Sequence, residues 1–389
     1  MAAGIPSLPP PVFVNDADGL DPNLVLADMI AAFESAAGRT LQPAQVERLL
    51  INLYAYRESL VRNAIQYAAQ QNLLAVAIFP MLDYLGELVG VTRLVAQSAT
   101  SILEFTLSIA LTVPISIPQG TLAGTSDGQY SFATDSVLVI PAGALSGSVS
   151  ASAVQPGAGA NGYLPGQVSV LLNPSAIIAS VSNTVITAGG SAPETDDHLR
   201  TRIQAAPNQF SVAGPAGAYR FFALGVDPSI MDAQVVSPAP GQINVYILTG
   251  PVTVQPQAAP NLAGIAGAPL LSRVEAALSG DSVRPLTDTV NVLAVTEVDY
   301  EITAVVTLYS DADPVATMAA ANTAAVQYTL GLAAKIQRDI VPSQVIAALS
   351  VAGVYEITLT APSYVQLSAG QWANCTAISL TEAVSTEHS

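Results

Sequence analysis

The sequence predicts an α+β multidomain protein with an N-terminal helical segment, a central antiparallel β domain and two α+β units toward the C-terminus. Three observations predict it. Apolar residues after Gln42 recur at helical spacing, short strand-like runs further on are separated by Gly, Pro and Asn, and helical and strand patterns alternate in the remainder. At 389 residues the chain is long enough for several domains. We expect four parts: residues 1–95, 96–190, 191–295 and 296–389.

The first part is expected to be helical after a Pro-rich N-terminal arm. Apolar residues three and four positions apart define one helical face, which we expect to be part of the core. The members of this face are Val46, Leu49, Leu50, Leu53, Leu60, Val61, Ala64 and Ile65. Glu58 and Arg62 add an i,i+4 ion pair on the solvated side. Beyond Ala68 the chain is apolar nearly all round to Leu82, which predicts a second helix, either core or a docking surface for another subunit.

The second part is predicted to be a small sandwich or barrel-like β domain. Residues 105–113 alternate between apolar and polar side chains, which is typical of a strand. Pro114 and Pro118 follow, so this uncharged stretch is not a membrane span, and the second uncharged stretch, 136–193, is broken by several Pro and Gly residues. Further strands are expected within 116–128 and at 130–132, 137–140, 146–153 and 168–172.

The third part is predicted to mix helices and strands. Ser191 and Glu194 have the spacing of a capping box, and Asp196 and Asp197 suit the positive end of a helix that continues through Ile203. Further helices are expected at 216–224 and 269–278, with strands at 233–237, 242–248 and 288–295.

The fourth part begins with a clearly alternating strand, at residues 296–308. Asp313 is expected to cap an alanine-rich helix that has Pro314 in its first turn and continues to about Arg338. A short helix at 343–349 and a strand at 355–360 complete the part. The acidic tail after Glu382 is expected to be frayed.

Composition limits the function. The chain carries 29 acidic and 12 basic residues, a formal net charge of −17, so it would repel nucleic acid. Hydrophobic residues make up 51% of it, charged residues only 11%, and the mean hydropathy is +0.47, so its surface is expected to bury itself against partners. Cys375 is the single cysteine, which excludes an intrachain disulfide and is consistent with a reducing compartment. The N-terminus lacks the layout of a secretion signal, so we expect synthesis in the cytosol.

Reactive side chains in a recognisable arrangement are not found. Residues 157–162 match the Gly-x-Gly-x-x-Gly string of dinucleotide sites, but Pro165 breaks any following helix, so we interpret them as a turn. Asp196, Asp197 and His198 adjoin, yet neighbours on a helix point in different directions, and Asp196 is expected to pair with Arg200. The other histidine, His388, is in the tail. Glu297, Asp299 and Glu301 are expected to solvate a strand face, and Trp372 to be a packing residue. We predict no catalytic, cofactor-binding or metal-binding residues, no cofactor and no enzymatic activity.

Several stretches, in this order along the chain, resemble the baseplate protein J family of contractile-tailed phages. They are Leu82 to Gly86 with Leu88 to Arg93; Ile117 to Thr121 with Ile140 to Gly143; Pro156 to Asn161 with Gly166; Gly189, Gly190, Glu194 to Asp197, Leu199, Arg200, Arg202 and Ile203; Gly214 to Tyr219; and Val283 to Asp288.

The resemblance implies a structural wedge subunit of a baseplate. Copies would join other wedge proteins in a sixfold ring around the hub and spike, and the ring would rearrange to release sheath contraction. The expected partners are therefore other wedge proteins and copies of the chain itself, with indirect contacts to hub, spike and sheath-proximal proteins, and with no membrane insertion. The expected location is the baseplate of a virion tail assembled in the bacterial host cytoplasm. Two alternatives remain: a host-glycan-binding adhesin, and a cell-wall-degrading enzyme that uses carboxylates.

Overall fold

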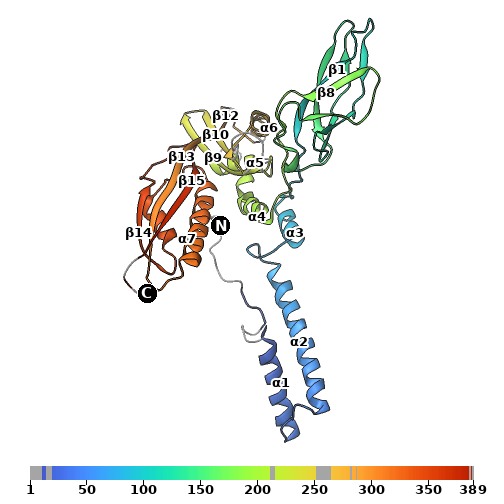
Figure 1. Ribbon diagram of the computed structural model, residues 1–389. Coiled ribbons are helices and arrows are strands. Elements are labelled where there is room, and N and C mark those ends of the chain that lie inside the picture. Colours follow the sequence, from blue (N-terminus) through green and yellow to red (C-terminus); the bar gives the residue numbers. More distant parts are fainter. Residues whose placement is uncertain are drawn as a thin grey trace. The chain divides into compact units, whose positions relative to one another are not determined.

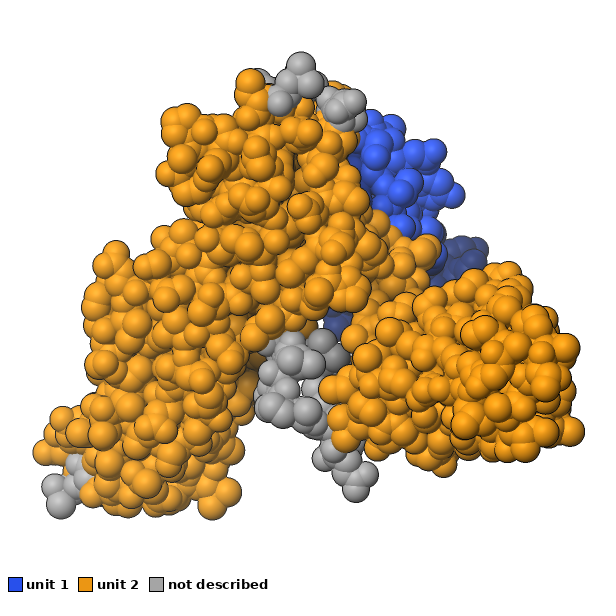
Figure 2. Space-filling view, turned by 90° about the horizontal axis from the view of Figure 1, so that it is seen from above, with its two compact units in different colours: residues 1–93, 196–206 blue, residues 94–195, 207–389 orange. Residues whose placement is uncertain are grey.

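The computed structural model describes residues 11–14, 20–210, 215–250, 264–280, 283–285, 287–384 and 387. The chain divides into two compact units (Figure 2): unit 1 is residues 1–93 with 196–206, and unit 2 is residues 94–195 with 207–389. The α+β multidomain class and the helical N-terminal segment are confirmed. Within the described residues, no helix is both long and apolar enough to cross a membrane.

Unit 1 contains a pair of helices that lie side by side (Figure 1), α1 (Pro22–Ala37) and α2 (Val46–Gln70). Asp21 caps α1 by accepting a hydrogen bond from the Asn23 amide at 2.8 Å, and Gly38 ends the helix in the left-handed conformation that glycine favours. Helix α1 lies within the expected N-terminal arm and was not predicted. The arm's residues 1–10 lie outside the described part of the chain.

The second helix predicted beyond Ala68 is wrong. The chain forms turns from residue 71 to 80 and then only a short helix, α3 (Met81–Glu87). Pro80, which cannot donate a backbone hydrogen bond, immediately precedes that helix. A later helix, α4 (Asp196–Ala205), completes unit 1.

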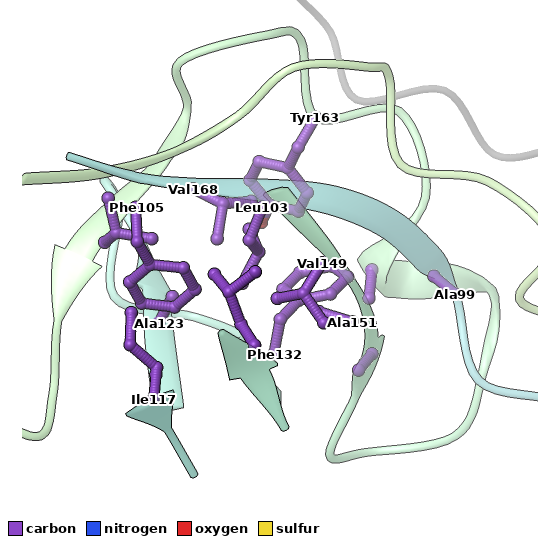
Figure 3. Packing of buried hydrophobic residues seen from close by; sticks show 14 of the residues in the cluster. Ala99, Leu103, Phe105, Ile117, Ala123, Phe132, Val149, Ala151, Tyr163 and Val168 are labelled. Atoms are coloured by element: carbon purple, nitrogen blue, oxygen red, sulfur yellow. The ribbon is translucent and has the colours of Figure 1, made fainter. Parts of the chain in front are cut away.

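The first part of unit 2 is an antiparallel barrel, as the sequence indicated. Its strands are β1 (Thr100–Leu107), β2 (Ile115–Ile117), β3 (Leu122–Thr125), β4 (Ser131–Thr134), β5 (Leu138–Ile140), β6 (Ser146–Ala153), β7 (Val168–Leu171) and β8 (Ile178–Asn183). Six of them form one sheet in the order β7-β3-β4-β6-β1-β8, and β2 pairs with β5. Strand β1 begins and ends earlier than the alternating pattern predicted. Its alternate residues Leu103 and Phe105 point into a core that also contains Phe132 (Figure 3).

Asn183 closes the barrel where the outer strands β7 and β8 meet. Its side chain accepts a hydrogen bond from the Val168 amide at 2.9 Å and donates to the carbonyl oxygens of Leu164 and Val185 at 3.0 and 2.9 Å. Asn183 is 1% exposed, so this amide takes the place of a backbone ladder in a site without water. Strand β8, and with it this contact, was not predicted from the sequence.

A middle module follows in unit 2, with its own core. Its elements are α5 (Ala216–Leu224), β9 (Ile230–Ala239), β10 (Gln242–Thr249), β11 (Gly264–Ile265), α6 (Ala268–Leu278) and β12 (Thr289–Ala294), and a 3₁₀ helix (Ala206–Phe210) precedes them in the sequence. Strand β10 pairs antiparallel with β9 and β11 and parallel with β12. Tyr219, Val245 and Val274 are among the buried residues that join the helices to this sheet.

The C-terminal module is a three-stranded sheet with two helices. Its elements are β13 (Thr296–Leu308), α7 (Pro314–Ala333), α8 (Pro342–Leu349), β14 (Val354–Ala361) and β15 (Gln371–Val384). Asp313 caps α7 as predicted, but the helix ends before Arg338. Strand β15 was not predicted; it pairs parallel with the central strand β13. It continues two residues past Glu382, to Val384, where the tail was expected to be frayed, and of the residues beyond Val384 the structure describes only Glu387. His388 lies outside the described residues.

We expect Asn183→Ala to destabilise the barrel by about 2–4 kcal/mol, because the Val168 amide and two carbonyl groups would lose their partner in a buried site. The measurement is urea denaturation combined with hydrogen exchange of the β7 and β8 amides. Thr184→Ala is the control, because its hydroxyl makes one long, exposed hydrogen bond of 3.3 Å to Ile102. Equal effects of the two substitutions would contradict the role given to Asn183.

Candidate functional site

Helix α2 carries its apolar residues on the outside. The side chains of Val46, Leu49 and Leu53 are 67%, 60% and 57% exposed, which contradicts the prediction that this face belongs to the core. We call the whole set the α2 stripe: Val46, Leu49, Leu50, Leu53, Leu60, Val61, Ala64 and Ile65. Tyr54, Tyr56 and Tyr67 are exposed beside it.

The side of α2 that is buried is small or polar. Its buried residues are Ala55, Ser59 and Gln66, at spacings of four and seven, so they share one face. Ser59 satisfies its hydroxyl by donating to the Ala55 carbonyl at 2.9 Å. Such a face buries little apolar area, and the stripe on the other side leaves much exposed. The apolar side of α2 therefore faces outward, which is the reverse of what an isolated pair of helices would need.

Gln66 is buried because it holds the arm. Its amide nitrogen donates to the Pro11 carbonyl at 2.7 Å, and its amide oxygen accepts from the Phe13 amide, also at 2.7 Å. Gln70 adds a longer bond of 3.2 Å to the same carbonyl. One side chain thus binds both polar groups of an extended backbone, and the described part of the arm runs along α2.

The second feature of unit 1 is a junction of arginines that attaches α4 to residues 71–93. Arg93 binds Asp83 at 2.5 Å and Asp196 at 2.7 Å, although the two carboxylates are more than 100 residues apart in the sequence. The Phe79 ring centre lies 5.8 Å from its guanidinium carbon. Hydrogen bonding to Asp83 is the largest effect on the pKa of Arg93 and raises it, so the cation is held firmly charged.

Two further arginines, both on α4, bind backbone carbonyls of residues 71–93. Arg200 donates to the carbonyls of Leu74 and Ala77 at 2.7 and 2.8 Å, and Arg202 donates to the Thr92 carbonyl at 3.1 Å. These bonds satisfy carbonyl groups in a stretch that has no regular structure of its own. They therefore fix an irregular loop onto a helix.

Close packing completes the junction at Gly86. A side chain there would collide with the Val91 carbonyl and would come within 3.2 Å of the Ile203 side chain. Only glycine allows α3 and α4 to approach this closely.

Two local predictions near α4 are wrong. Asp196 pairs with Arg93 rather than Arg200, and Arg200 pairs with Asp197. Glu194 does not form a capping box with Ser191, because its amide donates to the Leu94 carbonyl at 3.0 Å and its carboxylate accepts from the Leu94 amide at 2.8 Å. In both cases a partner about 100 residues away replaced the local one.

Residues 157–162 form a turn between strands, as predicted. Gly157 has φ +140°, and a short 3₁₀ helix (Ala158–Ala160) follows it. Asn161 then binds both backbone groups of Gly190, at 2.7 and 2.8 Å. The turn thus binds residues near the start and the end of the barrel segment, Gln97 and Gly190. The α-helix that a dinucleotide site needs after its glycines does not follow residue 162.

The other residues considered in the sequence have structural positions. Glu297, Asp299 and Glu301 are exposed along β13, and Asp299 accepts a hydrogen bond from Asn374 at 2.7 Å. Trp372 is buried, and the half-buried Cys375 packs against the C-terminal core. Across the described residues, no group of three or more potential metal ligands occurs.

Comparisons with known proteins match four models of one family along most of the chain. They are the baseplate J-like N-terminal domain at residues 47–100, the barrel domain at 102–190, the central domain at 211–294 and the C-terminal domain at 300–381. The chain belongs to the baseplate J-like family.

Baseplate protein J of Escherichia phage P2 is 34% identical over an alignment of 189 residues, and the alignment covers 47% of this chain. The match spans 57% of the length of that relative, a little more than half. Among solved structures, a chain of the sixfold-symmetrised cryo-EM structure of the anti-feeding prophage baseplate aligns with a TM-score of 0.41 and 15% identity, covering 90% of this chain and 89% of that one.

The junction brings together two of the stretches that first suggested this baseplate J-like family. Asp83, Gly86 and Arg93 come from one quoted stretch, and Asp196 and Arg200 come from another. The structure brings these two stretches together in unit 1. Gly214 and Leu286, from the later stretches, lie outside the described residues.

We expect Arg93→Ala to destabilise unit 1 by about 1–3 kcal/mol, because two partly buried carboxylates would lose their cation. Thermal unfolding with hydrogen exchange of α4 measures the effect. Arg62→Ala is the matched control: its 2.9 Å pair with Glu58 lies on one helix and is more exposed, so its loss should cost about 0.5 kcal/mol or less. A larger loss for Arg62→Ala would contradict the junction's role.

Proposed function

We propose that this chain is a structural, non-enzymatic subunit of the baseplate of a contractile phage tail or a related tail-like particle. The observation that carries the proposal is the α2 stripe, an apolar surface suited to burial against another protein. Family membership supports the same conclusion, because the phage P2 relative is itself named a baseplate protein. The location that follows is the virion tail baseplate, assembled in the bacterial host cytoplasm.

In this proposal the chain is a wedge subunit. Copies join other wedge proteins and one another in a sixfold ring around the hub and spike, and the ring transmits the trigger for sheath contraction. Contacts with the hub, spike and sheath-proximal proteins are indirect. The barrel and the two later modules form the ring and shift as rigid bodies, while the helices of unit 1 hold the wedge partners.

The size of the α2 stripe favours a permanent partner. Burying one leucine or valine side chain contributes about 1.5–3 kcal/mol, and the stripe offers seven exposed large aliphatic side chains. A surface of this kind is rare on a monomer and is typical of an obligate interface. The occupant that fits its shape is one or more amphipathic helices laid along α2.

The charge of α2 indicates the charge expected of the partner. Residues 38–70 contain four arginines and two glutamates, a local net charge of 4 − 2 = +2 in a chain of −17. Arg57 lies within the stripe, four residues from both Leu53 and Val61, and it is exposed. A helix that covers the stripe would need a carboxylate opposite Arg57, because an unpaired buried cation is costly. We therefore expect the docking helix to be acidic as well as apolar.

Gentle disruption of purified particles tests the assignment. The chain should leave the particle in complexes with neighbouring wedge proteins, identified by mass spectrometry of the separated fractions. Release solely as a free monomer would overturn the proposal. Glycan-array binding by the barrel, with no wedge complex, would support the adhesin alternative instead.

We expect the double substitution Leu49→Glu, Leu53→Glu to weaken partner binding at least about 100-fold, because two buried leucines together contribute about 3 kcal/mol or more. Co-purification of the tagged full chain with wedge partners, quantified against chain abundance, measures the effect. Asn52→Glu is the control: it adds a charge to the same helix on the side of Ala55 and Ser59, away from the stripe. Normal complexes with both glutamates present would remove the stripe from the interface.

A further inference from the structure

The middle and C-terminal modules are joined by much more than the chain between them. Strand β12 ends at Ala294 and β13 begins at Thr296, so only Val295 separates the two sheets. Val295 is 4% exposed and belongs to a small core of its own with Leu248, Ile336 and Trp372. Leu248 comes from the middle module, and the other two come from the C-terminal one. This third cluster lies between the two modules, and its residues are as buried as those of the core of each module.

Asp232, on β9 of the middle module, places a buried carboxylate at this joint. Its Oδ1 accepts hydrogen bonds from Arg220 at 2.7 Å and from the Ala233 amide at 3.0 Å, both in its own module. Its Oδ2 accepts from the Ile336 amide at 3.1 Å, in the C-terminal module. One carboxylate therefore binds donors from both modules at once. The side chain is only 11% exposed, so each of these bonds is poorly replaced by water.

Gln234, two residues along the same strand, also binds the C-terminal module. Its amide oxygen accepts from the Gly370 amide at 2.7 Å, and its amide nitrogen donates to the side chain of Gln337. Gln337 has φ +58°, a left-handed conformation that is unusual for a residue other than glycine, and its own amide donates to the Gln371 carbonyl at 2.8 Å. The backbone after α7 therefore adopts a conformation that places the Gln337 side chain against Gln234 of β9.

Trp372 contributes close packing between the two modules. Its indole nitrogen donates to the Ala333 carbonyl at 2.7 Å, which orients the ring. The ring lies against Gly264 of the middle module, where a Cβ would be 2.6 Å from the ring edge. Tyr246 lies against Gly370 in the same way from the other module. Each module therefore supplies an aromatic ring and a glycine that receives the ring of the other.

We propose that the described residues of the middle and C-terminal modules, from 215 onward, are a single rigid body, and that the carboxylate of Asp232 locks the two modules together. Bonds from both modules to one buried group allow little rotation, because any rotation breaks at least one of them without replacement. In an assembled particle, movement would then occur at other joints of the chain. The inference does not depend on the proposed function, because it concerns the free chain.

Distances between spin labels in the full chain test the proposal. Cys375 is first replaced by serine, and labels are attached at Glu275→Cys on α6 and Gln327→Cys on α7, both exposed positions in different modules. The expected result is one narrow distance distribution by pulsed electron paramagnetic resonance. A broad or double distribution in this parent protein would overturn the rigid body, whatever the variants show.

Asp232→Ala should broaden the distribution between Glu275→Cys and Gln327→Cys and should speed hydrogen exchange at Ile336 at least about tenfold. A second pair within the C-terminal module, Gln327→Cys with Glu356→Cys, should stay narrow, which separates loosening of the joint from unfolding. If Asp232→Ala does not fold, Asp232→Asn gives the result, because its amide has the same shape but only one acceptor oxygen, so it cannot accept from the Ile336 amide and from the donors of its own module on opposite sides. An unchanged distribution in a folded variant would overturn the role of Asp232.

Asp339→Ala is the matched control. The Asp339 carboxylate also accepts two hydrogen bonds, from the Leu367 amide at 2.9 Å and the Tyr364 hydroxyl at 3.1 Å, but all three residues lie in the C-terminal module. Its loss should leave the distribution between the modules narrow. Broadening by Asp339→Ala equal to that by Asp232→Ala would contradict a specific lock at Asp232.

Discussion

The contact of Arg93 with Asp83 and Asp196 is the constraint on which the chain's organisation depends. The chain passes from unit 1 to unit 2 after Arg93, builds the barrel, and returns to unit 1 at Asp196. Arg93 is thus bound to the residue at which the chain comes back. On the barrel's side, Gln97 pairs with Ser191 and Thr100 with Ala188, so the two ends of the barrel also run together. An inserted domain with adjacent ends disturbs its host little, which explains how one helical unit is built from two distant stretches.

Sequence reasoning worked where the structure is determined locally. Helix α5 and strand β6 have the expected bounds, because Pro215 and the glycines near β6 mark their ends in the sequence itself. Strands β8 and β15 were missed. Each is an outer strand held by a distant partner: β15 pairs with β13 across more than 60 residues, and its pattern of Asn, Thr and Ser is not strongly alternating. For such strands, long-range pairing outweighs local preference.

The candidate site shows a different limit. The periodicity of α2 correctly identified which residues share a face, and it could not identify what covers that face. Burial was assigned to Leu49 and Leu53 because an apolar face normally meets the core of the same chain. The signal that could have corrected this was on the opposite side, where the spacing of Ala55, Ser59 and Gln66 shows a second face that is small and polar. The residues of the arginine junction could be picked out in the sequence, but their contacts could not be predicted, because no local pattern relates Asp83 to Asp196.

These two features of unit 1 have different consequences for stability. The junction is satisfied within the chain, with its carboxylates and carbonyls bound to arginines, so it is complete before any partner arrives. The α1–α2 pair buries few apolar residues and exposes many, so its free energy of unfolding in the free chain should be small, and much of its stability should come from binding. The side of α2 that faces inward is polar enough to be satisfied by Gln66 and the arm without a large core. If a partner covers the stripe as proposed, a helix pair built in this way would gain most of its stability from that contact, whereas the junction would not depend on it.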